Sequence, residues 1–201
     1  MKLVSLLIGG ILGLGAGAAS ALVMAGMVGS GVRLSGNVDA DGWQSDWTIG
    51  STTANPWTRA RIARHGLLAL TKGEAVYFTK AVDDDGKHLT EDCTYRVSGK
   101  GMPALWWSVT LYNGESYLPD NTDDALSYDL TEAAAEGRAD DWAFTVSPTR
   151  PSEGGWVSSR AAGDFDLTLR LYKPAAALIS DPDATLPPPA IQRLSCGGQG
   201  S

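Results

Sequence analysis

Hydrophobic and polar positions follow two different patterns along the chain, one before residue 33 and another after residue 73. From Leu3 to Val32 there are 30 residues without a charge. A helix of that length reaches about 45 Å, which exceeds the roughly 30 Å hydrocarbon core of a bilayer. Residues 1–32 are therefore predicted to hold a cytoplasmic end and a transmembrane helix. A cleaved signal peptide is the alternative, because "AGAAS" resembles a cleavage site, but the apolar run continues past it.

The charges that flank this segment give a slight preference for one orientation. Lys2 precedes it and Arg33 follows it, while the acidic residues that come next have little influence. We expect a single-pass protein of the inner membrane, with its C-terminal domain in the periplasm.

Small residues recur at every fourth position of the apolar segment. Such spacing lets two membrane helices approach closely, so it predicts a homo-oligomer. Gly and Ala are also simply common in membrane helices, which is the alternative explanation. The residues that would form this contact are Gly9, Gly13, Gly17 and Ala21, followed by Ala25 and Gly29.

Residues 33–54 are rich in Gly, Ser and Asp and are predicted to form a stalk, after which a helix is expected. Asn55 is suited to cap that helix, Pro56 to its first turn and Gly73 to its end. Arg59 falls in the apolar sector of this helix. Because a charge that faces a core needs a partner, Arg59 is expected to have a structural role beside a carboxylate or carbonyl group.

After Gly73 the hydrophobic period changes from that of a helix to the alternation of strands. The segments "EAVYFTKAV", "CTYRVSG", "ALWWSVTLYN", "DWAFTVS" and "DFDLTLRLY" read as strands separated by turns. "TEAAAEGR" and "PAAALIS" are expected to form short helical turns. Many short strands without long helices between them predict a mainly β, mostly antiparallel sandwich or barrel over residues 55–196, with a disordered tail at 197–201.

Two of these strands combine an apolar face with an amphipathic one. In the first strand the apolar face consists of Leu105, Trp107, Val109 and Leu111, and the other face carries Trp106 and Tyr112. In the second strand the apolar face consists of Phe165, Leu167, Leu169 and Leu171, and the other face carries Asp166, Arg170 and Tyr172. Aromatic and polar groups together suit sugars, lipid headgroups or a protein partner. If the strands are neighbours, the candidate binding surface is Trp106, Tyr112, Asp166, Arg170 and Tyr172. The alternative is ordinary packing beneath the 55–72 helix or the C-terminal tail.

The chain has two cysteines, Cys93 at the start of a strand and Cys196 in the tail. An oxidising compartment would allow them to form a disulfide that fixes the tail to the sandwich. Two free thiols in a reducing compartment are the alternative.

Charge and composition exclude several classes of function. The net charge of −7 argues against nucleic acid, which binds to basic surfaces. Two His and two Cys at unrelated spacings form no zinc pattern, and "VDDDGKHLTED" departs from the calcium-loop pattern, so no metal is expected. The sequence shows no phosphate loop, dinucleotide fingerprint or nucleophile elbow, and no cofactor is expected. A carboxylate pair for glycoside hydrolysis stays open, because its spacing is spatial.

Several ordered motifs resemble one bacterial family. "NPWTRARIARHGLLALTKGEAVYF", "CTYRVSG", "WWSVTLY", "YLPDN" and "FDLTLRLYKP" are similar to the domain of unknown function 1214, over roughly Trp43 to Cys196. The resemblance implies a jelly-roll-like β-sandwich with helical additions and no settled activity, and the apolar segment resembles that of short anchored members. It also marks Asn55, Arg59 and Asn121, for which we expect structural roles, and adds Trp156 to the candidate surface, although "GGWVSS" departs from the family pattern there.

These patterns together predict a membrane-anchored protein of the cell envelope that acts as a binding or assembly module for an unknown envelope ligand. The alternative is an envelope hydrolase that acts on glycan or lipid through a carboxylate pair. A third hypothesis is a purely structural component of the envelope.

Overall fold

The structure is a computed structural model that describes residues 2–25, 28, 37–51, 56–57, 59–60 and 70–197. The chain divides into two compact units. One comprises Met1–Gly36 with Asp46–Ala69, and the other comprises Asn37–Ser45 with Leu70–Ser201.

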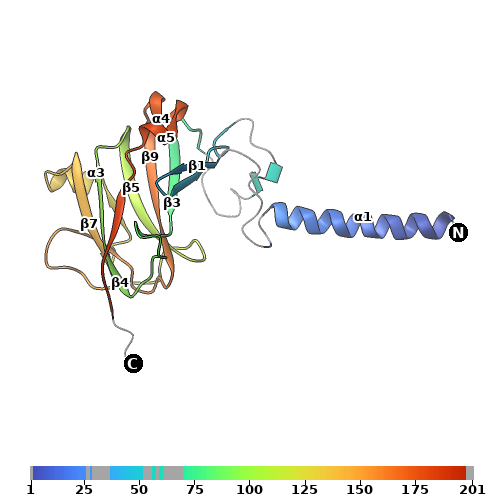
Figure 1. The fold of residues 1–201 in the computed structure, drawn as a ribbon, viewed down its shortest axis with the longest axis horizontal. Helices are drawn as coiled ribbons and strands as arrows, with labels where there is room; N and C mark the ends of the chain where they lie inside the picture. Colours follow the sequence, from blue (N-terminus) through green and yellow to red (C-terminus); the bar gives the residue numbers. More distant parts are fainter. Residues whose placement is uncertain are drawn as a thin grey trace. The chain divides into compact units, whose positions relative to one another are not determined.

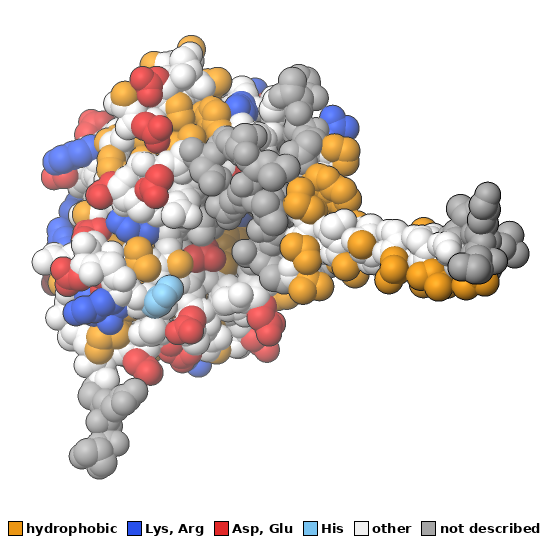
Figure 2. Space-filling model, turned by 45° about the vertical axis from the view of Figure 1, so that its right-hand side comes forward, with side chains coloured by type: hydrophobic (Ala, Val, Ile, Leu, Met, Phe, Trp, Pro, Cys, Tyr) orange, Lys and Arg blue, Asp and Glu red, His pale blue; other side chains and the backbone are white. Residues whose placement is uncertain are grey.

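The first unit contains the helix α1, which extends over Lys2–Met24. Hydrophobic side chains follow its length in Figure 2, and Ile11 and Leu14 are 69% and 78% exposed. Within the described ranges, however, no helix combines the length and the hydropathy that a membrane span requires. The transmembrane helix expected over residues 1–32 is thus not shown. The helix expected over 55–72 lies mostly outside the described residues, although Pro56, Trp57, Arg59 and Ala60 are helical.

The second unit is built from two β-sheets (Figure 1). The six-stranded sheet has the order β1-β2-β3-β9-β5-β6, and the four-stranded sheet has the order β10-β4-β7-β8. The strands of the larger sheet are β1 (Asn37–Ala40), β2 (Trp43–Asp46), β3 (Ala75–Lys80), β5 (Ala104–Asn113), β6 (Ser127–Asp129) and β9 (Phe165–Pro174). Those of the smaller sheet are β4 (Cys93–Lys100), β7 (Asp141–Ser147), β8 (Gly155–Ser158) and β10 (Ala190–Cys196).

Aromatic side chains from both sheets form the centre of the core. Trp107 of β5 packs on Trp142 of β7, with ring centroids 4.4 Å apart. A Cβ atom at Gly99 of β4 would lie 2.3 Å from the Trp142 ring, so a residue without a side chain is needed beside it. The inward residues of β9, Leu167, Leu169 and Leu171, are completely buried. The two sheets therefore meet through the apolar faces that the alternation predicts.

Short helices complete this unit. Asp129 caps α3 (Leu130–Ala135), where it and Glu132 form a capping box. The helices α4 (Ala176–Ser180) and α5 (Pro182–Thr185) follow β9. The predicted helical turns after β6 and β9 are confirmed.

Three details differ from the sequence predictions. Residues 37–46, placed in a stalk, form β1 and β2. The strands β7 and β8 are parallel, so the smaller sheet is mixed and not purely antiparallel. Leu105 is 75% exposed because it lies at the end of β5, opposite Lys173, where a positive φ of 49° interrupts the pairing. The jelly-roll arrangement stays a prediction.

Candidate functional site

The structure brings five of the six predicted surface residues together on one side of the larger sheet. The strands β5 and β9 are antiparallel neighbours, in which Trp106 faces Tyr172 and Tyr112 faces Asp166. Arg170 lies between these pairs, opposite Ser108. All five point away from the buried side of the sheet, and all are half-buried. We call this side of the sheet the outer face.

The aromatic end of the outer face is held by β5, β9 and α3. The rings of Trp106 and Tyr172 lie 5.3 Å apart at 59°. The indole Nε1 of Trp106 donates a hydrogen bond of 3.2 Å to Oγ1 of Thr131, at the start of α3. The ring is therefore fixed at one edge, while the side chain stays partly exposed. This Trp is the outward member of the Trp106–Trp107 pair, and its neighbour Trp107 is in the core.

Arg170 occupies the centre of the outer face, between β3 and β5. Its guanidinium group donates a 2.9 Å hydrogen bond to Oγ1 of Thr110 and another to the hydroxyl group of Tyr112. The same group lies 5.3 Å from the centre of the Tyr112 ring, which is a cation–π distance. All of these contacts are with neutral groups.

Asp166 is the acidic member of the outer face, four residues before Arg170 on the same strand. Burial raises the pKa of Asp166 to about 6, although the hydrogen bond from Thr168 Oγ1, at 3.2 Å, lowers it. Thr168 in turn shares a 3.1 Å hydrogen bond with Thr79 of β3. A row of hydroxyl groups thus extends from Asp166 across the sheet.

Sequence reasoning missed the contribution of β3 to this face. Tyr77 lies directly opposite Arg170, and Thr79 lies opposite Thr168. Burial raises the pKa of the Tyr77 hydroxyl, with further raising by Tyr172 and Tyr112 and some lowering by Arg170. The alternation in "EAVYFTKAV" was sufficient to place Tyr77 and Thr79 on one side. What the sequence lacked was the pairing of β3 with β9, which joins residues far apart along the chain.

The remaining predicted residues lie elsewhere. Trp156 is on β8 of the smaller sheet, only 9% exposed, where its Nε1 donates to the Ser147 carbonyl at 3.1 Å. The structure places Trp156 away from the candidate surface, because β8 belongs to the other sheet. The guanidinium group of Arg150 lies over its ring, 5.4 Å from the centre. Arg59 is exposed and so does not face a core, and Asn55 lies outside the described residues.

Asn121 has a structural environment. Its Nδ2 donates to the Arg160 carbonyl at 2.7 Å, and its Oδ1 accepts from the Asp123 amide at 3.1 Å. Arg160 also forms a salt bridge with Asp123. Asn121 therefore connects the loop that follows β5 to the loop between β8 and β9.

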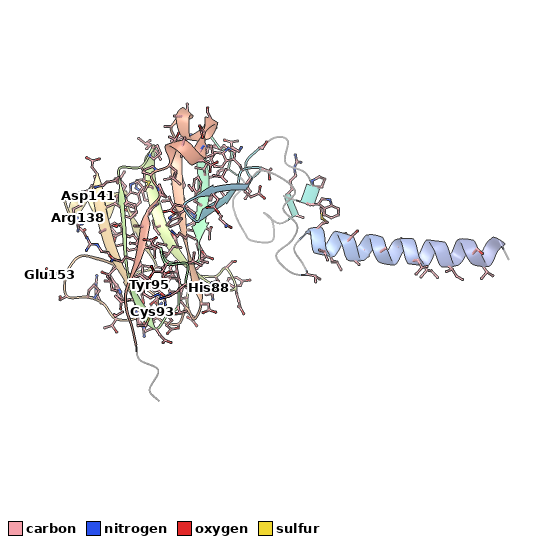
Figure 3. All side chains as sticks on the ribbon, in the orientation of Figure 1. His88, Cys93, Tyr95, Arg138, Asp141 and Glu153 are labelled. Atoms are coloured by element: carbon pink, nitrogen blue, oxygen red, sulfur yellow. A yellow bond between two sulfur atoms is a disulfide. The ribbon has the colours of Figure 1, made fainter. Side chains whose placement is uncertain are left out.

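A second arginine cluster lies at one end of the sandwich, near Cys93, Tyr95 and His88 in Figure 3. The Nε of Arg193 donates to Oδ2 of Asp83 at 2.6 Å, and these side chains are 20% and 1% exposed. A terminal nitrogen of Arg193 donates to the His88 carbonyl at 2.6 Å, and the guanidinium group lies 5.3 Å from the Tyr95 ring centre. The turn 83–87 thus contains a buried carboxylate.

The predicted disulfide between Cys93 and Cys196 is confirmed. The two cysteines are directly opposite each other on β4 and β10. The disulfide therefore fixes the last strand to the smaller sheet, as expected for the tail.

The outer face offers one carboxyl group with a raised pKa for chemistry. Asp129 of β6 accepts the Thr131 and Glu132 amides at 2.7 and 3.2 Å as the helix cap. Within the described parts of the chain, no group of three or more His, Cys, Asp or Glu residues is arranged to hold a metal ion.

Fold and site together define a two-sheet β protein with an aromatic and polar outer face. Residues 74–176 match a family model described as "Protein of unknown function (DUF1214)". The chain belongs to this family, as its motifs suggested. The match begins just before β3 and ends in α4, so it contains every residue of the outer face described above.

A solved structure shares the fold. The VPA0106 protein from Vibrio parahaemolyticus is similar with a TM-score of 0.55 and 20% identity, over 71% of this chain and 36% of that protein. This chain therefore spans about a third of that protein. An uncharacterized protein from Burkholderia cenocepacia matches with a TM-score of 0.36 and 20% identity, over 64% of this chain and 31% of its own. Among curated proteins, none matches the chain.

Proposed function

We propose that this protein is a binding module and that the outer face of the larger sheet is its ligand-binding surface. The observation that carries the proposal is the composition of that face. Side chains on its inner side are buried apolar groups, whereas the outer side presents Trp106, Tyr112 and Tyr172 around Arg170, each partly exposed. Aromatic side chains and arginine are the residue types that dominate recognition surfaces.

The hydrogen bonds that hold the side chains of the outer face in place support the same proposal. Trp106 is hydrogen-bonded to Thr131, and Arg170 is hydrogen-bonded to Thr110 and Tyr112. Side chains that are fixed before binding lose little conformational freedom when a ligand arrives. Because these residues lie on paired strands and not on loops, the surface keeps its shape.

Hydrolysis receives less support from the geometry. A glycosidase of the common type needs two carboxyl groups that flank the bond it cleaves. Asp166 supplies one group with a raised pKa, and Asp129 is occupied as the cap of α3. We therefore do not propose an enzyme.

The test of the binding surface is chemical crosslinking in intact cells, followed by mass spectrometry of the molecules that co-purify. Replacing both Trp106 and Arg170 by Ala should abolish recovery of the partner while circular dichroism stays unchanged. Leu105→Ala is the matched control, because Leu105 is exposed on the same strand but points away from this face. Equal recovery with the double variant and the control would contradict the proposal.

We also propose that the protein acts in the cell envelope. The disulfide supports this location, because disulfides persist mainly in oxidising compartments. Protease treatment of sealed spheroplasts should degrade residues 70–197 if they are periplasmic, and protection would contradict this location. Carbonate extraction checks separately whether residues 1–32 hold the chain in the inner membrane. Crosslinking of a Gly13→Leu variant checks whether copies of the chain associate through Gly9, Gly13, Gly17 and Ala21.

A further inference from the structure

Arg170 has no acidic partner, unlike Arg160 and Arg193. Salt bridges within the described residues join Arg160 to Asp123 and Arg193 to Asp83, and none of them includes Arg170. Its hydrogen bonds go to the hydroxyl groups of Thr110 and Tyr112. A half-buried cation with neutral neighbours is an unbalanced charge.

The nearest acid on the same strand is too far away to balance this charge. Asp166 lies four residues before Arg170, which corresponds to about 13 Å along a strand. Its carboxylate instead accepts from Thr168. The two neighbours of Arg170 across the sheet are Tyr77 and Ser108, and neither is acidic.

Arg170 also retains donors for a ligand. A guanidinium group has five N–H donors, and the two side-chain hydrogen bonds that it makes use two of them. The remaining donors suit an oxyanion, because the planar fork of an arginine matches carboxylate and phosphate groups.

An aromatic platform lies beside this anion-binding position. Trp106 is two residues from Ser108, which is opposite Arg170, so it is a diagonal neighbour of Arg170. Its ring is 5.3 Å from that of Tyr172. The C–H groups on one side of a sugar ring pack well on such rings. Tyr77 is half-buried and lies directly opposite Arg170 on β3, and its hydroxyl group can both donate and accept a hydrogen bond, as a polyhydroxylated ring requires.

We propose that the outer face binds an anionic sugar, with the carboxylate or phosphate at Arg170 and the sugar ring against Trp106 and Tyr172. This inference rests on the proposed function and specifies its ligand class. Trp106 and Tyr172 give affinity for the ring, and Arg170 gives the preference for a negative charge.

Calorimetric titration of the full chain with D-glucuronate, D-glucose 6-phosphate and D-glucose tests this inference. Both charged sugars should bind at least about ten-fold more tightly than glucose, because charge-assisted hydrogen bonds are the strong ones. The relative affinities of the first two distinguish a carboxylate from a phosphate ligand. Acetate, which has the charge without the ring, should bind more weakly than either.

Variants separate the two parts of the site. Arg170→Gln should lower the affinity for charged sugars to that for glucose, whereas Arg170→Lys should keep the preference. Trp106→Leu should weaken binding of all three sugars about five-fold and leave acetate unchanged. Arg96→Gln is the matched control, because Arg96 is an exposed arginine on the smaller sheet, and it should change nothing. If Arg170→Gln does not fold, the salt dependence of glucuronate binding by the unaltered chain replaces it.

Two results would overturn the inference: equal affinity for glucose and glucuronate, or no binding of any of the three sugars. If the Trp106→Ala, Arg170→Ala double variant still loses its partner in cells, then only the ligand class is wrong and the proposed function stands. If the double variant keeps its partner while glucuronate binds at Arg170, the sugar site stands and the cellular partner binds elsewhere.

Discussion

Two arginines of this protein share one geometry and differ in everything around it. Arg170 and Arg193 each place the guanidinium group 5.3 Å from the centre of a tyrosine ring, Tyr112 and Tyr95 respectively. Arg193 is also bonded to Asp83, whose side chain is 1% exposed. Arg170 is bonded to hydroxyl groups only.

The difference indicates which arginine has a structural role. The Arg193 cluster is complete, because a buried carboxylate balances the cation and the His88 carbonyl accepts another of its donors. Arg170 lacks that balance and lies on a partly exposed face. Removing the partner of a charge that is balanced within the fold costs stability, whereas Arg170, which has no such partner, is the arginine that we propose for a ligand.

Loss of the disulfide, which lies beside Arg193, should cause the largest loss in the free energy of unfolding. Cys93 and Cys196 are 103 residues apart in sequence, and closing a loop of that length is worth about 4 kcal/mol. Urea unfolding of Cys196→Ser against the oxidised protein should show this loss, whereas sugar binding should be retained. An unchanged midpoint would show that the end of β10 contributes nothing to the fold.

Removal of the buried carboxylate should cost about 3 kcal/mol, since Asp83→Asn leaves the Arg193 charge unbalanced. Desolvation raises the pKa of Asp83, but hydrogen bonds from the Lys87 amide, Arg193 and the Asp85 amide outweigh it, so the pKa is lowered. A lowered pKa gives stability that is present above the ordinary value of 3.8 and is lost as the pH falls through the folded-state value.

Urea unfolding at pH 7 and in acid checks both parts of this expectation. The difference between Asp83→Asn and the unaltered protein should be full at pH 7 and should shrink as the pH falls below 3.8. The control is Asp141→Asn, which removes an exposed pair with Lys100, and it should cost far less than Asp83→Asn because solvent screens that pair. Similar losses from both substitutions would contradict the distinction between buried and exposed pairs.

The stability that depends on Asp166 of the outer face should change with pH in the opposite sense to that of Asp83, because burial disfavours the charged form of Asp166. The pKa of Asp166 is raised to about 6 from 3.8, so its contribution is most favourable below pH 3.8 and is lost as the pH rises through 6. Asp166→Asn should therefore stabilise the protein by about 2 kcal/mol at pH 7.5 and by nothing at pH 3.5. Thermal unfolding at the two pH values measures this, and a destabilised variant at pH 7.5 would contradict it.

The smallest effect on stability is expected for the substitution of Arg170, which compares the two arginines directly. Arg170→Gln should change the free energy of unfolding by less than about 1 kcal/mol, because it breaks only bonds to neutral, partly exposed groups. Urea unfolding beside Arg193→Gln, which should cost several times more, measures the contrast. A large loss from Arg170→Gln would assign it a structural role like that of Arg193.

Local patterns in the sequence predicted the strands and their faces well. The alternation in "DFDLTLRLY" placed Leu167 inside and Arg170 outside, and both predictions are confirmed because β9 lies in the middle of the sheet with a core on one side only. Leu105 is an exception to the same rule, because it lies at the end of its strand, where the positive φ of Lys173 interrupts the pairing with β9.

Contacts between distant segments were beyond the sequence. Neither the pairing of Tyr77 with Arg170 nor that of Asp83 with Arg193 leaves a local signal, since each depends on which strands become neighbours. For Trp156 the sequence analysis predicted a neighbourhood that the structure does not show. This aromatic residue in a family motif was assigned to the candidate surface, although its strand belongs to the other sheet.

The position of β10 has a consequence for biosynthesis. This strand is the last that the structure describes, yet it pairs with β4 near the middle of the sequence and carries Cys196 and Arg193. Until it leaves the ribosome, Cys93 is a free thiol, Asp83 is an unbalanced carboxylate and β4 is an open edge that other chains can join. We therefore expect a product that terminates before residue 190 to aggregate more readily than a chain that contains β10.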